Sequence, residues 1–427
     1  MRHTSLIRVS GTVIFTKTFC SELTKMYPVV FLLCLLMTLT EASALTIDRY
    51  NGKLGVEVSM YSRDGAFPNQ AYKSNLSVFF QSEFLWRSNQ GASSLYFVPY
   101  LRIDQRDHSK SHLDIREFIW KYSQRDWHFN IGIGKVFWGV TEFNHLVDVI
   151  NQTDLVESID GEEKLGQPMF NISVIRDWGA LDLFILPGFR ERTFAGTEGR
   201  LRAPVAVDTE TVLYDSLDGD QHIDFAVRWS DTFRYFDAGA YFFDGTNREP
   251  LFEIQPKTEL VKSADFVAIA NYQQMKQFGI DLQATVSSWL YKFEGLWRQT
   301  TQTQFLASQL GVEYAFYNLA GRDLEIGLLV EYGWDERGVK SSSIFQNDLF
   351  VGGRVSFNDL DNKELLFGLA YDRDYFSNSA FFEYSQRLYS DGKLSLEGRL
   401  FNAESAQDPL NTLTDDDYIQ LTFEYFF

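Results

Sequence analysis

From residue 45 onward, the chain repeats stretches of about ten residues in which apolar and polar side chains alternate. In 323–335, for example, Leu328 and Val330 fall on one face, and Glu331 and Asp335 fall on the other. Successive side chains of a β-strand point to opposite sides, so each stretch predicts a strand with one apolar and one polar face.

Eighteen stretches of this kind can be counted, and sixteen strands is the alternative count. Two of them, 111–124 and 127–138, change face midway, which indicates β-bulges. The predicted strands are 51–62, 74–87, 93–106, 111–124, 127–138, 168–178, 180–194, 221–232, 234–244, 268–285, 289–301, 305–318, 323–335, 346–357, 364–375, 379–390, 393–403 and 417–427.

Aromatic and charged residues distinguish a membrane barrel from a soluble sandwich. Trp229, Trp289 and Trp334 lie near the ends of apolar faces, as in the interfacial girdles of a membrane barrel. Arg228 and Lys292 lie on the polar faces, which a dry sandwich core would not tolerate. The pattern therefore predicts an all-β fold, a single transmembrane antiparallel β-barrel of about eighteen strands. A periplasmic β-sandwich is the alternative.

The connections between the predicted strands alternate in length. Tight turns, such as 178–179 and 286–288, are interleaved with longer polar connections. Short periplasmic turns opposite long external loops are typical of outer-membrane barrels. The longer connections are 63–73, 140–167, 195–220, 245–267, 336–345 and 404–416.

The N-terminal part of the chain has the pattern of an export leader. Residues 27–40 form the only long apolar run of the sequence, and Ala42 and Ala44 follow it as a small-x-small cleavage pattern. We expect a signal peptide over 1–44, with Met26 as an alternative start, and a barrel domain over 45–427. An uncleaved N-terminal anchor is the alternative.

Composition excludes several classes of protein. The chain has 39 Lys plus Arg against 58 Asp plus Glu, a net charge of −19, which argues against nucleic-acid binding. Cys20 and Cys34 both lie in the leader, so the exported part can form no disulfide. Asp215, Asp218 and Asp220 depart from the EF-hand spacing, and we predict no metal site and no cofactor.

The last ten residues resemble the C-terminal insertion signal of bacterial outer-membrane barrels, which end on Phe after alternating apolar residues. This resemblance implies recognition by the barrel assembly machinery and insertion into the outer membrane of a Gram-negative bacterium. The five alternating positions are Ile419, Leu421, Phe423, Tyr425 and Phe427.

A second resemblance covers about 133–200. The runs 134–139 (GKVFWG) and 146–155 (LVDVINQTDL) are similar to segments of an uncharacterised proteobacterial porin-like outer-membrane family. This likeness reinforces the expected fold and does not indicate a solute.

Connection 140–167 would be the third external loop, which general porins, by resemblance, fold into the barrel as a constriction. Its apolar residues would pack against the inner wall, and a short helix over 144–157 is one expectation. If the loop enters the lumen, its carboxylates would favour cations; the alternative is a solvated surface loop. The carboxylates of this predicted constriction are Glu142, Asp148, Asp154, Glu157, Asp160, Glu162 and Glu163.

The densest basic patch follows this loop. Its arginines could form a wall facing the carboxylates, bind lipopolysaccharide phosphates at the rim, or pair with Glu191 and Glu198. The four residues are Arg190, Arg192, Arg200 and Arg202.

The sequence thus predicts a porin-like outer-membrane channel for passive diffusion of small polar solutes, in contact with outer-membrane lipid and lipopolysaccharide. A structural or adhesion-type barrel with a closed lumen is the alternative. A barrel hydrolase is less favoured, because no His lies in a recognisable motif with Ser or Asp. The solute and the oligomeric state stay open.

Overall fold

The computed structural model describes residues 45–89, 91–256, 266–321 and 323–427. The predicted signal peptide, 1–44, lies outside the described residues. Within the described residues no helix is both long and apolar enough to span a membrane.

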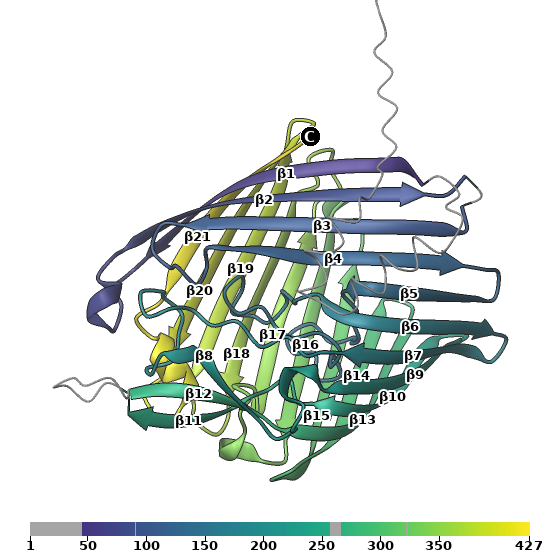
Figure 1. Cartoon of the computed structure of the whole chain (residues 1–427). Helices are drawn as coiled ribbons and strands as arrows, with labels where there is room; N and C mark the ends of the chain where they lie inside the picture. The colour runs from purple at the N-terminus through teal and green to yellow at the C-terminus, as the bar shows by residue number, and fades with distance from the viewer. Residues whose placement is uncertain (1–44, 90, 257–265, 322) are drawn as a thin grey trace, which may run out of the picture.

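Eighteen antiparallel strands form a closed barrel, which confirms the predicted fold class and the higher of the two counts (Figure 1). Strand β1 (Thr46–Tyr61) pairs with β21 (Tyr418–Phe426) and thereby closes the sheet. The strands between them are β2 (Ser74–Arg87), β3 (Ser93–Asp104), β4 (His112–Ser123), β5 (Trp127–Gly134), β6 (Gln167–Arg176), β7 (Gly179–Pro187), β9 (Ile223–Phe233), β10 (Phe236–Thr246), β13 (Gln274–Val286), β14 (Trp289–Thr300), β15 (Gln304–Phe316), β16 (Glu325–Asp335), β17 (Asn347–Ser356), β18 (Glu364–Asp372), β19 (Asn378–Leu388) and β20 (Gly392–Asn402).

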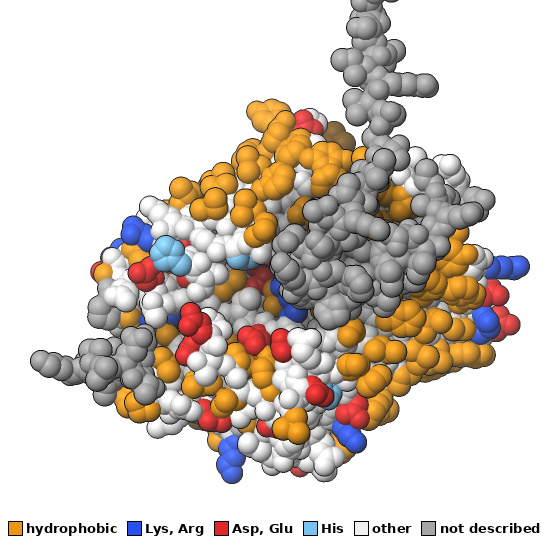
Figure 2. All heavy atoms as spheres, in the orientation of Figure 1, with side chains coloured by type: hydrophobic (Ala, Val, Ile, Leu, Met, Phe, Trp, Pro, Cys, Tyr) orange, Lys and Arg blue, Asp and Glu red, His pale blue; other side chains and the backbone are white. Residues whose placement is uncertain are grey.

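The side chains of the barrel strands are distributed in the opposite sense to those of a soluble protein. On β16, the Val330 side chain is 47% exposed on the outside, whereas Glu331 is 0% exposed in the interior. Leu328 and Trp334 share the outer face with Val330. Figure 2 shows hydrophobic side chains spread over the strands. An apolar outside and a polar inside suit a wall between lipid and a hydrated lumen.

The connections alternate as predicted, with short turns at one end of the barrel and mostly long loops at the other. Three external loops are short, so the alternation is not complete. The external loops are L1 (62–73), L2 (105–111), L3 (135–166), L4 (188–222), L5 (247–273), L6 (301–303), L7 (336–346), L8 (373–377) and L9 (403–417).

A separate three-stranded sheet stands on the external loops, to the left of the barrel in Figure 1. It joins β8 (Val207–Tyr214) of L4 with β11 (Leu251–Pro256) and β12 (Phe266–Tyr272) of L5. The prediction of one strand over 268–285 was wrong, because β12 belongs to this sheet and β13 to the barrel. The alternation runs on through the break, so it could not reveal two elements.

Two strands are shorter than predicted. β5 ends at Gly134, because the chain then turns inward and buries Trp138 in the lumen. β7 ends at Pro187, where Gly188 adopts a φ of +84° that favours glycine. The residues that follow Gly134 and Pro187 therefore belong to loops L3 and L4.

The predicted bulge in 111–124 is confirmed. The pairing of β3 with β4 shifts between Val98 and Pro99, and Arg116 has no partner on β3. The bulge breaks the strict alternation of β4, and the buried side chain of Arg116 reaches L3.

Candidate functional site

Loop L3 lies inside the barrel. Its turns and bends contain no helix, so the helix expected over 144–157 was wrong. The reason lies in its anchors: backbone N–H groups of L3 donate to side chains of the barrel wall instead of closing helical turns.

The first anchor of L3 is Glu294, on β14. Its Oε1 accepts hydrogen bonds from the N–H of Val140 at 2.7 Å, and from the N–H and hydroxyl of Thr141 at 3.0 and 2.7 Å. Its Oε2 accepts from the N–H of Val147 at 3.2 Å. The carboxylate is fully buried, and these donors supply its stabilisation.

The second anchor is Glu331, on β16, which is also fully buried. It accepts hydrogen bonds from the N–H of Glu142 at 2.8 Å and from the N–H of Phe143 at 3.2 Å. The ring of Phe143 then stacks on Phe350 with the centroids 4.9 Å apart. Neither anchoring carboxylate was predicted as a site residue, because both look like ordinary lumen-facing positions in the alternation.

The middle of L3 packs against the neighbouring part of the wall, which runs from β6 to β13. Val147, Val149 and Ile150 are at most 2% exposed and join Trp138 in a hydrophobic cluster inside the barrel. This packing agrees with the apolar surface predicted for the loop. The wall side of the cluster consists of Met169, Phe184, Leu186, Ala226, Tyr241, Phe243 and Met275.

The later part of L3 is held by buried ion pairs. Glu157 lies 2.8 Å from the Nη2 of Arg102, and Asp154 pairs with Arg116 at the β4 bulge. Burial opposes ionisation of Glu157, but the charges of Arg102 and Arg116 outweigh it and lower the pKa of its carboxyl. L3 thus contacts the wall on both sides of the lumen.

All seven predicted loop carboxylates have a cationic or titratable partner within 4.0 Å. Their local negative charge is therefore largely compensated, which weakens the potential that they impose on the lumen. The pairs are Glu142 with Arg354 and Lys292, Asp148 with Lys164, Asp154 with Arg116, Glu157 with Arg102, Asp160 with Arg399, Glu162 with His145, and Glu163 with Lys135.

Two of the predicted arginines lie beside L3. Arg190 pairs with Asp114 at 2.8 Å, and the Nε of Arg192 donates to Gln152 at 3.2 Å. L4 runs along L3 here, since Thr193 donates its hydroxyl to Asp154 at 2.6 Å.

The other two arginines lie in the further part of L4. Arg200 pairs with Asp416 of L9, and Arg202 donates to the carbonyls of Ala203 and Pro204. The four arginines therefore do not form one surface.

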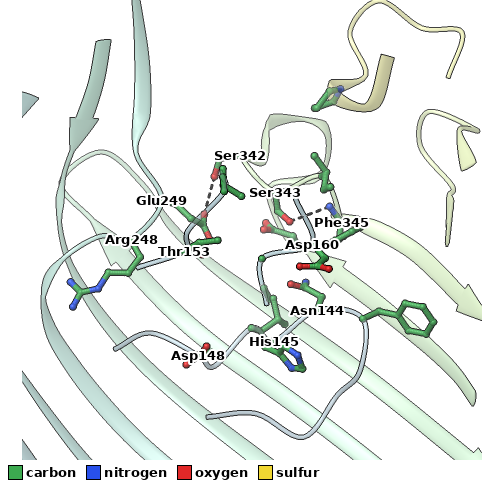
Figure 3. Close-up of a pocket in the computed structure, with 18 of the residues that line it drawn as sticks. Asn144, His145, Asp148, Thr153, Asp160, Arg248, Glu249, Ser342, Ser343 and Phe345 are labelled. Carbon is green, nitrogen blue, oxygen red and sulfur yellow. Dashed lines mark hydrogen bonds between the residues drawn. The ribbon is translucent and has the colours of Figure 1, made fainter. Parts of the chain in front are cut away.

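A pocket of about 390 Å³ lies between L3 and the neighbouring loops. Figure 3 shows Asn144, His145 and Asp148 of L3 with Glu249 of L5 and Ser342 of L7 around it. It brings together groups from five external loops around the external side of L3.

One wall of this pocket is basic. Glu249 lies 3.1 Å from the Nη1 of Arg298, and the charges of Arg298, Arg337 and Arg192 outweigh burial and lower its pKa to about 2. Arg337 also pairs with Asp335 at 2.6 Å. Three guanidinium groups around two carboxylates leave an excess positive charge at this wall.

His112, Asp154 and Glu157 lie close enough together to be considered as metal ligands. Both carboxylates, however, are already bound by Arg102 and Arg116. Two adjacent guanidinium groups would repel a cation, so this cluster is a structural ion-pair network.

The five residues of the predicted insertion signal lie on β21 and at the chain end, with their side chains 40% to 52% exposed on the outer face. The backbone of Phe427 exchanges hydrogen bonds with Gly52 of β1 at 2.9 and 3.0 Å. The last residues of the sequence therefore form the seam of the barrel.

No known protein family matches the sequence, and no curated protein is similar to it. Solved structures, by contrast, share its architecture. Wzi of Escherichia coli, described as a carbohydrate-binding β-barrel involved in group 1 capsule assembly, has a TM-score of 0.51 at 10% identity, over 93% of this chain and 87% of that chain. OccK2 (OpdF) of Pseudomonas aeruginosa, solved in complex with glucuronate, has a TM-score of 0.50 at 10% identity, over 88% of this chain and 95% of that chain.

The closed barrel of eighteen strands and this likeness define the class: the chain has the fold of porin-like outer-membrane β-barrels. At these identities, the likeness concerns the fold, and the solute has to be argued from the residues of the lumen.

Proposed function

We propose that the protein is a porin-like channel of the Gram-negative outer membrane, through which small polar solutes diffuse passively. The observation that carries the proposal is the course of L3, which crosses the lumen between Glu294 and Glu331 on one side and the arginines of β3 and β4 on the other. A loop held by polar anchors inside a barrel narrows the lumen at a defined place.

The proposal includes the route to the membrane: a cleaved leader directs export, and the C-terminal signal directs insertion. The outer face then contacts lipid and lipopolysaccharide. The exposed apolar outer face supports the membrane location. The role is non-enzymatic, because transport of this kind requires only a lumen of suitable width and charge.

Planar-bilayer recordings on the purified protein test the channel. We expect stable current steps, and a larger conductance for the double variant Glu294→Gln, Glu331→Gln, because the anchors of L3 lose their charge. Glu210→Gln, at an exposed position of β8, is the matched control and should conduct like the native protein.

A barrel with a closed lumen, used for structure or adhesion, is the second candidate. The hydrophobic cluster that L3 forms with β6, β7, β9, β10 and β13 favours it, because apolar side chains fill this part of the lumen. Absence of current steps from both the native protein and the double variant would establish this candidate instead.

Ion selectivity is a finer part of the proposal. The predicted cation preference would come from L3, but pairing of all seven carboxylates leads us to propose that it is weak. Reversal potentials in a salt gradient measure it; a strong cation preference would show that the paired carboxylates still dominate the field.

A further inference from the structure

Two arginines of L4 line the pocket beside L3 without a carboxylate partner. Arg192 and Arg202 are both among its lining residues, together with groups of L3, L5, L7 and L9. Among the residues that the structure describes, neither guanidinium group forms an ion pair. The positive charge of each arginine is therefore unbalanced.

The remaining charges around the pocket are compensated. Each of the other lining arginines and lysines has a carboxylate partner: Lys164 with Asp148 at 3.3 Å, Arg248 with Asp224 at 2.6 Å, Arg298 with Glu249 at 3.1 Å and Arg337 with Asp335 at 2.6 Å. The other lining carboxylates are also paired, Asp160 with Arg399 at 2.6 Å and Glu162 with His145 at 2.9 Å. The two arginines of L4 therefore give the pocket a net positive charge.

Arg192 is held in place but keeps its terminal nitrogens free. Its backbone N–H donates to the hydroxyl of Tyr272 at 2.9 Å, and its Nε donates to Oε1 of Gln152 at 3.2 Å. Within the described part of the chain, its Nη1 and Nη2 donate to no protein acceptor. These two nitrogens form the end of a planar fork that can bind both oxygens of one carboxylate.

Burial makes the unbalanced charge costly. It lowers the pKa of Arg192, and the charge of Glu249 does not offset this effect. Burial also lowers the pKa of Arg202, whose Nε is buried without a hydrogen-bond partner. A negative charge that enters the pocket would therefore be stabilised.

The lining of the pocket suits an organic molecule. Leu146 packs against the buried Leu296 and Phe305, and all three line the pocket. Asn144 of L3 and Ser343 of L7 add polar groups (Figure 3). The volume of about 390 Å³ is that of a site for a small ligand. An inorganic anion would leave the apolar part of the pocket uncovered.

We propose that this pocket binds a small organic carboxylate, whose carboxylate group lies on the terminal nitrogens of Arg192. Its carbon body covers the apolar lining, and Arg202 adds to the positive potential that attracts the anion. The inference rests on the proposed function, because it names the class of solute that the channel admits. Binding itself can be measured without conduction.

Calorimetry on the purified protein in detergent tests the site. Gluconate is the probe, its neutral analogue sorbitol is the control solute, and inorganic phosphate is the second anion. At constant ionic strength we expect saturable binding of gluconate, weaker binding of phosphate and no binding of sorbitol. Equal binding of gluconate and phosphate would contradict an organic carboxylate site, and equal binding of gluconate and sorbitol would contradict the role of the charge.

Two variants of Arg192 locate the carboxylate. Arg192→Gln should weaken gluconate binding by about tenfold or more, the usual effect of losing hydrogen bonds between charged groups. Arg192→Lys keeps the charge but not the fork, and its affinity should lie between the two. Arg63→Gln, at a 65% exposed side chain of L1 outside the pocket, is the matched control and should bind like the native chain. Undiminished binding in Arg192→Gln would overturn the assignment.

A measurement on the native chain keeps the test decisive if these variants fail to fold. Phenylglyoxal modifies accessible guanidinium groups, and mass spectrometry identifies the modified residues. Gluconate should protect Arg192 and leave Arg63 reactive, whereas sorbitol should protect neither. Modification of Arg192 that gluconate leaves unchanged would contradict the site.

Bilayer recordings separate this inference from the proposed function. Gluconate binding without any current steps would refute the channel and leave the site standing. Current steps from a protein that does not bind gluconate would refute the site and leave the channel standing.

Discussion

Glu294 on β14 accepts hydrogen bonds at the same oxygen from both the backbone N–H and the side-chain hydroxyl of Thr141. The two residues are 153 positions apart in the sequence. This contact, with those of Val140 and Val147, holds the entry of L3 against the barrel wall. A single buried carboxylate thereby fixes the entry of a loop that has no regular structure of its own.

Removal of the Thr141 hydroxyl tests this anchor with little change of shape. Thr141→Val should destabilise the protein by about 1.5–3 kcal/mol, the usual contribution of a hydrogen bond to a charged group. Urea unfolding of the detergent-solubilised protein measures the loss. An unchanged midpoint would mean that the backbone N–H groups alone satisfy Glu294.

The ring of Phe143 lies where two strands carry glycine. A Cβ added at Gly368 would meet the Phe143 ring at 2.7 Å and the Phe381 ring at 2.6 Å, and one at Gly352 would meet Phe143 at 3.0 Å. The wall therefore has a recess for this side chain.

Filling this recess should displace L3. Gly368→Val is expected to change the single-channel conductance, because Phe143 can no longer stack on Phe350. Addition of Phe143→Ala should partly restore the native value. If the double variant behaves like Gly368→Val alone, the effect comes from β18 and not from the loop.

Disruption of the Arg116–Asp154 ion pair should reduce the unfolding free energy most when only one of the two residues is replaced. Arg116→Met leaves the buried charge of Asp154 without a cationic partner, and we expect a loss of about 3–5 kcal/mol in unfolding free energy. Arg116→Met combined with Asp154→Leu should lose less than Arg116→Met alone. A double-mutant cycle from denaturant unfolding gives the coupling; additive losses would show that the two residues act separately.

Glu249 should contribute to the acid sensitivity of the external mouth. Its pKa is about 2 in the fold against the usual 4.5 of a glutamate, so the folded state binds the proton less well than the unfolded state. The resulting stabilisation is present above pH 4.5 and is lost as the pH falls towards 2. The unfolding midpoint of Glu249→Gln should therefore depend less on pH in this interval. Glu210→Gln is the control, and an acid limb identical to that of the native protein in both variants would contradict the role of Glu249.

Much of the fold follows from the local alternation of apolar and polar residues. The alternation on β16 already places Val330 outside and Glu331 inside, because a strand has a period of two whatever its neighbours are. The same reasoning predicted eighteen strands, the bulge in 111–124 and the alternating lengths of the connections. The C-terminal aromatic alternation marked the strand that forms the seam.

Which charged residues pair across the lumen depends on the tertiary structure alone. Glu142 of L3 pairs with Arg354, 212 positions later, and no local period relates two such residues. For the same reason, the sequence showed the seven carboxylates of L3 as an unbalanced charge, while the fold gives each of them a partner. The sequence also could not distinguish β12 from β13, since the same alternation occurs in a strand of the external sheet and in a strand of the barrel. The sequence by itself determined which side of each strand meets lipid; only barrel closure, by joining distant strands, decided which charges meet in the lumen.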